Sequence, residues 1–198
     1  MNRNKKVKPH KTGLILLVLS VSIFLLPGCA SRAAVKENQL YAYLTDNSRF
    51  TLLSPAGIEK TMDMAQYVSA SYRGRNYFMN AWILADESGM EMTLLNELGA
   101  GMGVLSYRDG VIKFSSPVFP ENLGGEYIVA DFQLCFYDPL LLQKALKECG
   151  LTFEASGNSR RILHGKDLII EIEKYNNSIK LTNHLRGYSY TLEGDYDS

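Results

Sequence analysis

The cysteine at position 29 has the clearest chemistry in this chain. It closes the tetrapeptide Leu26-Pro27-Gly28-Cys29, which follows a basic head and an apolar run over residues 13–26. That run has the length of a secretory signal rather than of a membrane span. The pattern is typical of a lipoprotein signal peptide, whose cysteine thiol takes a diacylglycerol before cleavage. The alternative is a lone thiol in an ordinary signal peptide or anchor.

Cleavage before Cys29 predicts three parts: a signal peptide over residues 1–28, a lipidated tether over 29–48 and a single domain over 49–198. A diacylglycerol on the thiol and an acyl chain on the new amino terminus are enough for stable anchoring. Ala30 is not the aspartate that commonly retains lipoproteins at the inner membrane. We therefore expect a lipid anchor on the periplasmic face of the outer membrane, with the inner membrane left open for an organism with other sorting rules.

The charge balance argues against nucleic acid as a partner. Five of the 21 basic residues and none of the 21 acidic ones lie in the signal, so the mature chain carries a net charge of about −5. The only basic cluster in it is Arg160-Arg161, which offers no stripe for phosphates. The remaining length predicts one ordinary domain, expected to be a monomer.

The chain carries no recognisable enzymatic signature. Its two mature histidines, His164 and His184, lie far apart and lack metal-ligand spacing, and neither a nucleophile elbow nor a phosphate-binding loop is present. We expect no enzyme activity, no metal and no cofactor beyond the lipid on Cys29. Asp131 is the carboxylate to watch, because it lies in a mostly apolar segment where it could cap a neighbour, pair with Arg160 or Arg161, or face solvent.

The elements that would position these residues are mainly strands. Apolar alternation between turn signals predicts a meander, two helices and a second meander, with at least five antiparallel strands in the first sheet. The predicted strands are residues 49–54, 62–72, 77–84, 90–95, 102–107, 111–115, 151–154, 160–164, 168–175, 179–186 and 188–193. Residues 126–137 predict one helix, and Asp138-Pro139 begins a second that ends at Gly150. The tether could become helical near residues 40–44.

The two remaining cysteines are predicted to stay free. An oxidising compartment would permit a disulfide between Cys135 and Cys149. The second helix, however, carries Cys149 some 15 Å from its start at about 1.5 Å per residue. We expect two small buried side chains, although pairing stays open if the preceding segment folds back.

The strand over residues 77–84 is apolar on both faces. Phe78, Trp82 and Leu84 share one face, while the other carries Tyr77, Met79, Ala81 and Ile83. A curved sheet around a helix would bury both faces if its concave side held the helix or an apolar ligand. Methionines add adaptable side chains. The residues predicted to line such an acyl-binding cavity are Phe78, Trp82, Leu84, Met90, Met92, Leu94 and Met102. An ordinary core with methionine as filler is the alternative.

Several segments resemble a known group of proteins. These are Cys29 followed by strands, residues 94–99, the hairpin of residues 107–114, and residues 130–134. They look like an uncharacterised family of bacterial outer-membrane lipoproteins that are often encoded in aryl-polyene biosynthesis clusters and are similar in outline to LolB. The resemblance implies an α+β fold that is mainly β, with a curved antiparallel sheet or incomplete barrel closed by a helix pair, as in LolA and LolB. It also implies an apolar cavity for acyl chains or lipoprotein cargo, and a periplasmic carrier like LolA as a partner.

The same resemblance assigns a role to one loop leucine. LolB carries an Asn-Pro-Leu-Gly loop whose leucine helps to pass lipoprotein to the membrane, and the matching stretch here is Asn96-Glu97-Leu98-Gly99. Leu98 is therefore the expected membrane-transfer residue. Glu97 replaces the proline, and a leucine folded back on the core is the alternative. The expected function is transfer or insertion of acylated cargo at the outer membrane; the alternative is a protein-interaction module with a self-filled core.

Overall fold

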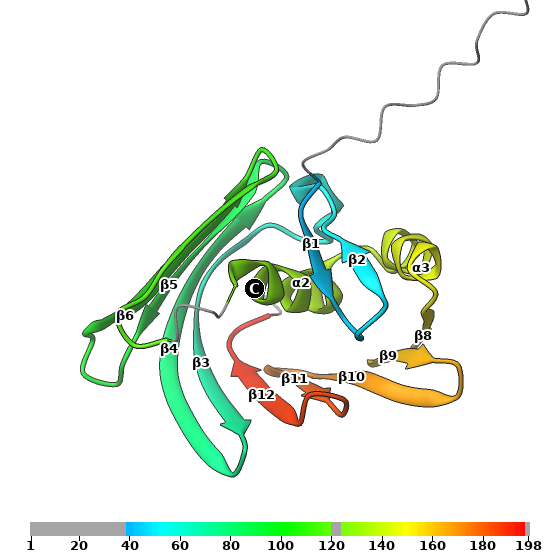
Figure 1. Cartoon of the computed structure of the whole chain (residues 1–198). Coiled ribbons are helices and arrows are strands. Elements are labelled where there is room, and N and C mark those ends of the chain that lie inside the picture. Colours follow the sequence, from blue (N-terminus) through cyan, green and yellow to red (C-terminus); the bar gives the residue numbers. More distant parts are fainter. Residues whose placement is uncertain (1–38, 120–123, 197–198) are drawn as a thin grey trace, which may run out of the picture. The chain divides into compact units, whose positions relative to one another are not determined.

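The computed structural model describes residues 39–119 and 124–196 of the 198-residue chain. Within them, ten strands form one antiparallel sheet in the order β7-β6-β5-β4-β3-β12-β11-β10-β9-β8. The sheet curves around helix α2 and does not close, because β7 and β8 lie at its two ends, where each pairs with a strand on one side only (Figure 1). The predicted α+β class, with its curved antiparallel sheet and two helices, is confirmed at this level.

The strand bounds follow the predicted pattern closely. Three predicted strands coincide with the observed ones, and the others shift by one to three residues at an end. The strands are β3 (Met62–Tyr72), β4 (Arg75–Asp86), β5 (Gly89–Leu95), β6 (Gly101–Arg108), β7 (Val111–Ser115), β8 (Thr152–Ser156), β9 (Ser159–His164), β10 (Asp167–Tyr175), β11 (Ser178–Asn183) and β12 (Tyr188–Glu193). The pairing of β12 with β3 joins the two meanders into one sheet.

Tight turns explain the regular hairpins. Asp109 and Gly110, which join β6 to β7, both have positive φ, at 53° and 70°. Two central residues with positive φ are the requirement of a type I′ turn, whose twist suits paired strands. Arg73 and Gly74 repeat this geometry between β3 and β4, with φ of 50° and 74°.

Two helices follow β7. Helix α2 (Gly125–Phe136) occupies the concave side of the sheet, and α3 (Pro139–Glu148) follows it directly (Figure 1). Asp138 separates them: its Oδ1 accepts the backbone N–H groups of Leu140 and Leu141 at 2.8 and 3.0 Å, with Pro139 opening α3. This N-cap with proline at the first helical position is the signal that predicted the break.

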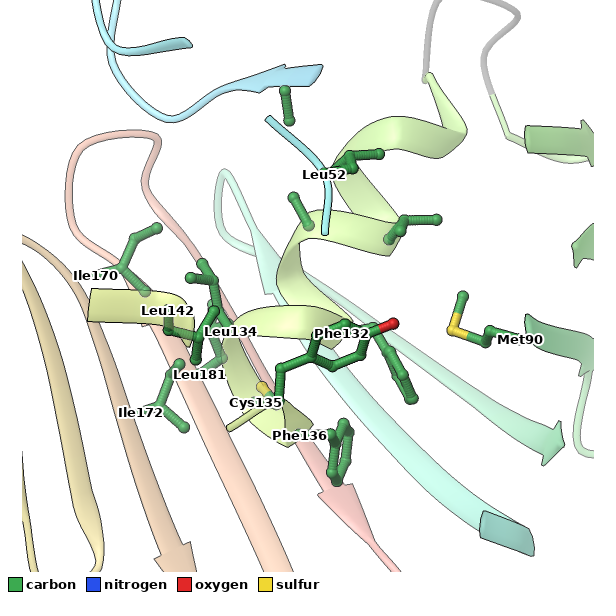
Figure 2. Close-up of a cluster of buried hydrophobic side chains, with 14 of the residues drawn as sticks. Leu52, Met90, Phe132, Leu134, Cys135, Phe136, Leu142, Ile170, Ile172 and Leu181 are labelled. Carbon is green, nitrogen blue, oxygen red and sulfur yellow. The ribbon is translucent and has the colours of Figure 1, made fainter. Parts of the chain in front are cut away.

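The core lies around α2. Val129, Leu134 and Cys135 of this helix are fully buried. Leu134 and, from α3, Leu142 face the side chains that β10 and β11 project inward, while Met90 of β5 lies on the other side of α2 (Figure 2). Among the described residues the buried core runs from Ala42 to Leu192, within a compact unit that spans residues 38–198.

The segment before residue 49 is structured differently from the expectation. Residues 41–43 form strand β1 (Tyr41–Tyr43), which pairs with β2 (Arg49–Thr51); the helix expected near residues 40–44 is wrong. Ala42 and Phe50 face each other in this hairpin and are 1% and 0% exposed. A short 3-10 helix, η2 (Pro55–Gly57), follows. Because these side chains pack onto the core, the folded domain begins before residue 49, the boundary predicted from the sequence.

No helix within residues 39–119 and 124–196 is long and apolar enough to cross a membrane.

Candidate functional site

The two faces of β4 are assigned by the structure. Met79, Ala81 and Ile83 point inward and are 6%, 2% and 1% exposed, whereas Phe78 and Trp82 are each 48% exposed on the outer face. Leu84 is on the outer face too. The prediction that these three residues line the cavity is therefore corrected: they lie across the sheet from the concave side. The physical reason is strand alternation: Phe78, Trp82 and Leu84 share one face, and the opposite face, with Met79, Ala81 and Ile83, is the one that packs into the core.

The outward residues form an exposed apolar surface. Trp82 pairs with Thr93 of β5, which pairs with Val104 of β6, so the three side chains lie in a row across the strands. We call Phe78, Trp82, Leu84 and Val104 the outer apolar surface; each is between 41% and 54% exposed. Phe78 also stacks on Tyr67, with ring centroids 6.3 Å apart. Clustered exposed aromatic and aliphatic side chains mark a contact surface more often than scattered ones do.

The loop between β5 and β6 presents Leu98 to solvent. Its side chain is 93% exposed. Asn96 organises the loop, because its Oδ1 accepts the N–H groups of Leu98 and Ala100 at 3.0 and 2.8 Å, and its backbone pairs with Gly99 and Ala100. Gly99 has a φ of +80°, which only glycine adopts without strain. Leu98 is thus held outward by a hydrogen-bonded turn, and the alternative of a leucine folded onto the core is excluded.

Glu97 is exposed in the same loop, and its charge acts on the Tyr67 hydroxyl of β3. The pKa of Tyr67 is raised, by desolvation first and then by the Glu97 charge. This contact joins the loop to the edge of the outer apolar surface, since Tyr67 stacks on Phe78. The carboxylate that replaces the proline of the LolB loop has a partner of its own.

The methionines and leucines of the predicted cavity divide between the faces. Met90 and Leu94 are buried on the inner face, 2% and 6% exposed, and Met92 lies half-buried on the same side. Met102 of β6 is half-buried and packs against the edge of the core, whereas Gly103 and Leu105 of the same strand are buried. The seven predicted residues are therefore not brought together: the inner group contacts the core around α2, and the outer group contacts solvent.

Asp131 is the one carboxylate on the inner side of α2 with a long-range partner. Its Oδ2 accepts the Tyr188 hydroxyl at 2.8 Å. Burial raises the pKa of Asp131 to about 7, against the opposing effects of that hydrogen bond and of the Arg186 charge. It does not pair with Arg160 or Arg161, which bind elsewhere. A carboxyl that favours its neutral form is suited to an apolar interior.

Replacement of Asp131 by asparagine should change the pH dependence of stability. The folded protein holds this proton more tightly than the unfolded chain does, so this group lowers the free energy of unfolding as pH rises from about 4 to about 7. In Asp131→Asn the amide oxygen can still accept the Tyr188 hydroxyl, but the side chain no longer binds or releases a proton. We expect equal stability at pH 4 and a more stable variant at pH 8, by about 1.4 kcal/mol per unit of raised pKa. Denaturant unfolding at both pH values measures this stability difference. Asp167→Asn, at an exposed position, is the control. Parallel pH profiles of stability for wild type and Asp131→Asn would contradict the prediction.

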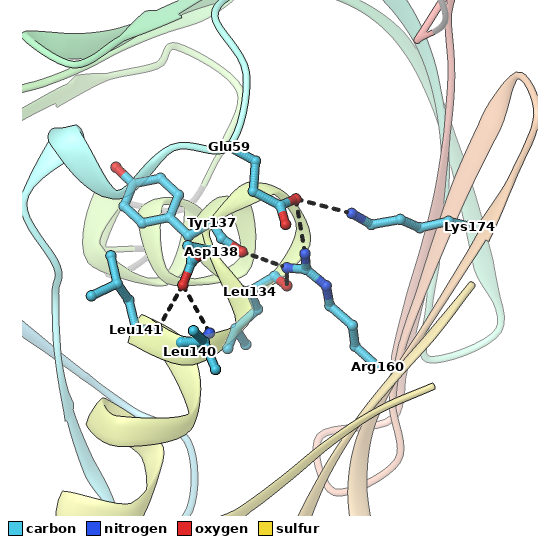
Figure 3. A network of polar contacts seen from close by, with 8 residues as sticks. All are labelled: Glu59, Leu134, Tyr137, Asp138, Leu140, Leu141, Arg160 and Lys174. Atoms are coloured by element: carbon cyan, nitrogen blue, oxygen red, sulfur yellow. Dashed lines mark hydrogen bonds and ion pairs between the residues drawn. The ribbon is translucent and has the colours of Figure 1, made fainter. Parts of the chain in front are cut away.

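A buried arginine closes the C-terminal end of α2. Arg160 of β9 is 5% exposed, and its Nη1 donates to the carbonyls of Leu134 and Tyr137, both at 2.9 Å. Its Nη2 donates to the Glu59 carboxylate at 2.9 Å, and Lys174 lies 3.5 Å from the same carboxylate (Figure 3). A cation at a helix C-terminus also suits the helix dipole. Burial lowers the pKa of Lys174, and the neighbouring Arg160 adds to this.

A cleft lies beside this network. It has a volume of about 460 Å³ and lies among the residues before β3, the start of that strand, and the adjoining ends of β10 and β11. Its apolar lining comes from Met62, Met64, Phe136, Ile179 and Tyr196, and its polar rim includes Glu59 and Lys174. Sequence reasoning missed this site, because its residues come from five separate segments and none forms a motif.

The cysteines and histidines assemble no metal site in the part of the chain that the structure describes. Cys135 is buried and Cys149 half-buried, and both are free thiols, as predicted. Burial raises the pKa of Cys135 to about 12, so this thiol stays protonated. Cys29 and the signal peptide over residues 1–28 lie outside the described residues.

These observations define an α+β protein whose open, curved antiparallel sheet wraps a buried helix and presents an apolar outer surface beside an exposed loop leucine. The chain belongs to the family described as "Protein of unknown function (DUF3261)", whose model matches residues 63–194. That match runs from the second residue of β3 to the residue after β12, so it covers all ten strands of the sheet except Met62 and leaves out the β1–β2 hairpin. A comparison with curated proteins gives no match.

Proposed function

We propose that this protein is a non-enzymatic lipoprotein, anchored through Cys29 to the periplasmic face of the outer membrane, that binds acyl chains of a lipid or lipoprotein cargo and assists their transfer or insertion. On this proposal the fold is LolA/LolB-like, and a periplasmic carrier like LolA delivers the cargo. A role linked to aryl-polyene lipids fits the same chemistry.

The observation that carries the proposal is the presentation of Leu98. A leucine that is 93% exposed at the tip of a hydrogen-bonded loop has no structural role in the described part of the chain. Burial of such a side chain in acyl chains gains about 1.5–3 kcal/mol. The outer apolar surface lies next to this loop. Phe78 of that surface stacks on Tyr67, and the charge of Glu97 in the loop acts on the Tyr67 hydroxyl.

On this proposal the acyl chain lies on the concave side of β4 and β5. Met90, Met92 and Leu94 lie on that side, and methionine side chains adapt to a guest more readily than branched ones. Since α2 already fills this space, binding requires the helix side chains to move aside. Each chain methylene buried gains about 0.8 kcal/mol, which is the driving force for that movement.

Lipid extraction of the purified domain followed by mass spectrometry tests this proposal. Retention of an acylated molecule supports it, and an empty domain that also fails to bind a fluorescent fatty acid contradicts it.

A second candidate function is favoured by one specific observation. The concave face is packed with α2 side chains that are 0% exposed, and among the described residues no strand pairs with the outer edges of β7 and β8. A self-filled core with free edges suits a module that binds a partner protein by adding a strand. Under this alternative the outer apolar surface contacts the partner and no lipid is retained.

A further inference from the structure

The segment after β12 lies over the C-terminal end of α2. The Tyr196 ring packs on Phe136, with centroids 6.0 Å apart. Gly194 donates its N–H to the Asn177 carbonyl at 3.0 Å. A Cβ atom at Gly194 would lie 2.9 Å from Met64 Cε and 3.3 Å from the Ala65 carbonyl oxygen, so this residue lies close against β3. The next two residues, Asp195 and Tyr196, line the 460 Å³ cleft.

Two buried polar atoms near this segment have no hydrogen-bond partner among the described residues. They are the hydroxyl of Tyr196 and Oε1 of Gln66. Gln66 is 2% exposed on the inner face of β3, beside Gly194, and its Nε2 donates only to the Met64 sulfur at 3.7 Å. An unpaired buried polar atom costs about 1–3 kcal/mol. The segment is held by the ring packing of Tyr196, by the Gly194 N–H bond and by Lys60 Nζ, which donates to the Tyr196 carbonyl at 3.5 Å. Burial of the unpaired Tyr196 hydroxyl opposes this placement.

The cleft beside Tyr196 has the chemistry of an amphiphile site. Met62, Met64 and Ile179 supply apolar walls. Glu59 pairs with both Arg160 and Lys174, at 2.9 and 3.5 Å, and the other charged lining residues are Lys60, Asp63 and Asp195, so the charges around the cleft balance. Its volume of about 460 Å³ falls in the range of ligand pockets. A rim whose charges balance favours a neutral polar group over an ionised one, because an added ion would be left without a counter-charge. Gln66 does not line the cleft: it lies behind Gly194, so its unpaired amide oxygen becomes accessible when residues 194–196 leave.

We propose that residues 194–196 are a built-in occupant of a ligand site at the end of α2, and that an acyl chain with a neutral polar head displaces Tyr196 to bind there. This inference rests on the proposed function, since it assigns the head-group class and the entry point of the cargo. The acyl chain takes the place of the Tyr196 ring against Phe136, and the neutral head pairs with Gln66. Displacement returns the Tyr196 hydroxyl to water.

The test uses the soluble domain with Cys29→Ala, 3-fluorotyrosine at position 196 and a pyrene-labelled monoacylglycerol as probe. Binding should move the fluorine resonance of residue 196 to the position of a solvent-exposed tyrosine. Tyr196→Ala should bind the probe about tenfold more tightly, because no occupant must leave. Tyr196→Phe keeps the ring and removes the unpaired hydroxyl, so it should bind severalfold more weakly than wild type. A pyrene-labelled fatty acid, with an ionised head, should bind more weakly than the monoacylglycerol.

The outcomes separate this inference from the proposed function. If the probe binds wild type and Tyr196→Ala equally and the fluorine resonance stays unchanged, the displacement is wrong while lipid binding stands. If wild type, Tyr196→Ala and Tyr196→Phe all fold and none binds either probe, both proposals are overturned.

Discussion

Arg160→Ala should lower the free energy of unfolding by about 3 kcal/mol and the thermal midpoint by about 10 °C. The substitution leaves the carbonyls of Leu134 and Tyr137 unpaired at the buried end of α2, and each such loss costs about 1–3 kcal/mol. Glu59 keeps Lys174 and is 38% exposed, so its lost ion pair adds little. The stability of Arg160→Lys should lie between those of wild type and Arg160→Ala, because one ammonium group cannot bond both the carbonyls and the Glu59 carboxylate as the guanidinium does.

The neighbouring arginine provides the matched control. Arg161 is 45% exposed and pairs with Glu154 and Glu171 at 3.9 and 3.5 Å. Surface pairs of this kind contribute about 0–1 kcal/mol, so the free energy of unfolding of Arg161→Ala should lie within about 1 kcal/mol of the wild-type value. Equal losses for the two alanine variants in denaturant unfolding would show that Arg160 does not hold the end of α2 as described.

Leu98→Glu should reduce binding of the soluble domain to phospholipid vesicles at least tenfold. Insertion of the leucine gains about 1.5–3 kcal/mol, and 1.4 kcal/mol is a factor of ten in affinity. The carboxylate also carries a desolvation cost at the membrane. Because the native side chain is 93% exposed, the variant should keep its folding free energy within about 0.5 kcal/mol. Vesicle co-sedimentation measures the binding.

Leu140→Glu is the control for this effect. Leu140 is 74% exposed in the first turn of α3, where an acidic side chain suits the helix dipole. We expect this variant to bind vesicles as wild type does. Unchanged binding of Leu98→Glu, with the fold intact, would remove the leucine from the mechanism.

The local structure was largely predictable because its signals are local. The turn residues with positive φ, the Asp138-Pro139 cap and the alternating apolar residues each act over a few positions, and the elements lie where these patterns put them. Strand β1 escaped prediction because three residues carry too little periodicity. Its stability comes from the pairing of Ala42 with Phe50 and from their burial, which no local pattern contains.

The site was less predictable because it depends on contacts far apart in the chain. Alternation in β4 showed two apolar faces but could not say which one meets the core, and the face with Met79, Ala81 and Ile83 is the buried one. Asp131 was recognised as unusual, yet its partner Tyr188 lies 57 residues away. Arg160 likewise reaches carbonyls of α2, and a backbone carbonyl leaves no mark in a sequence.

The most direct test of the account is native mass spectrometry with lipid extraction on the soluble domain carrying Cys29→Ala, so that its own anchor cannot act as ligand. Two bulky variants on adjacent residues of β5 localise the binding: Met92→Trp fills the inner face beside the core, and Thr93→Trp adds the same ring to the exposed outer face. We predict that wild type and Thr93→Trp retain an acylated molecule and that Met92→Trp loses it. A domain that is empty in all three forms and binds no fluorescent fatty acid would contradict the account and favour the partner-binding module.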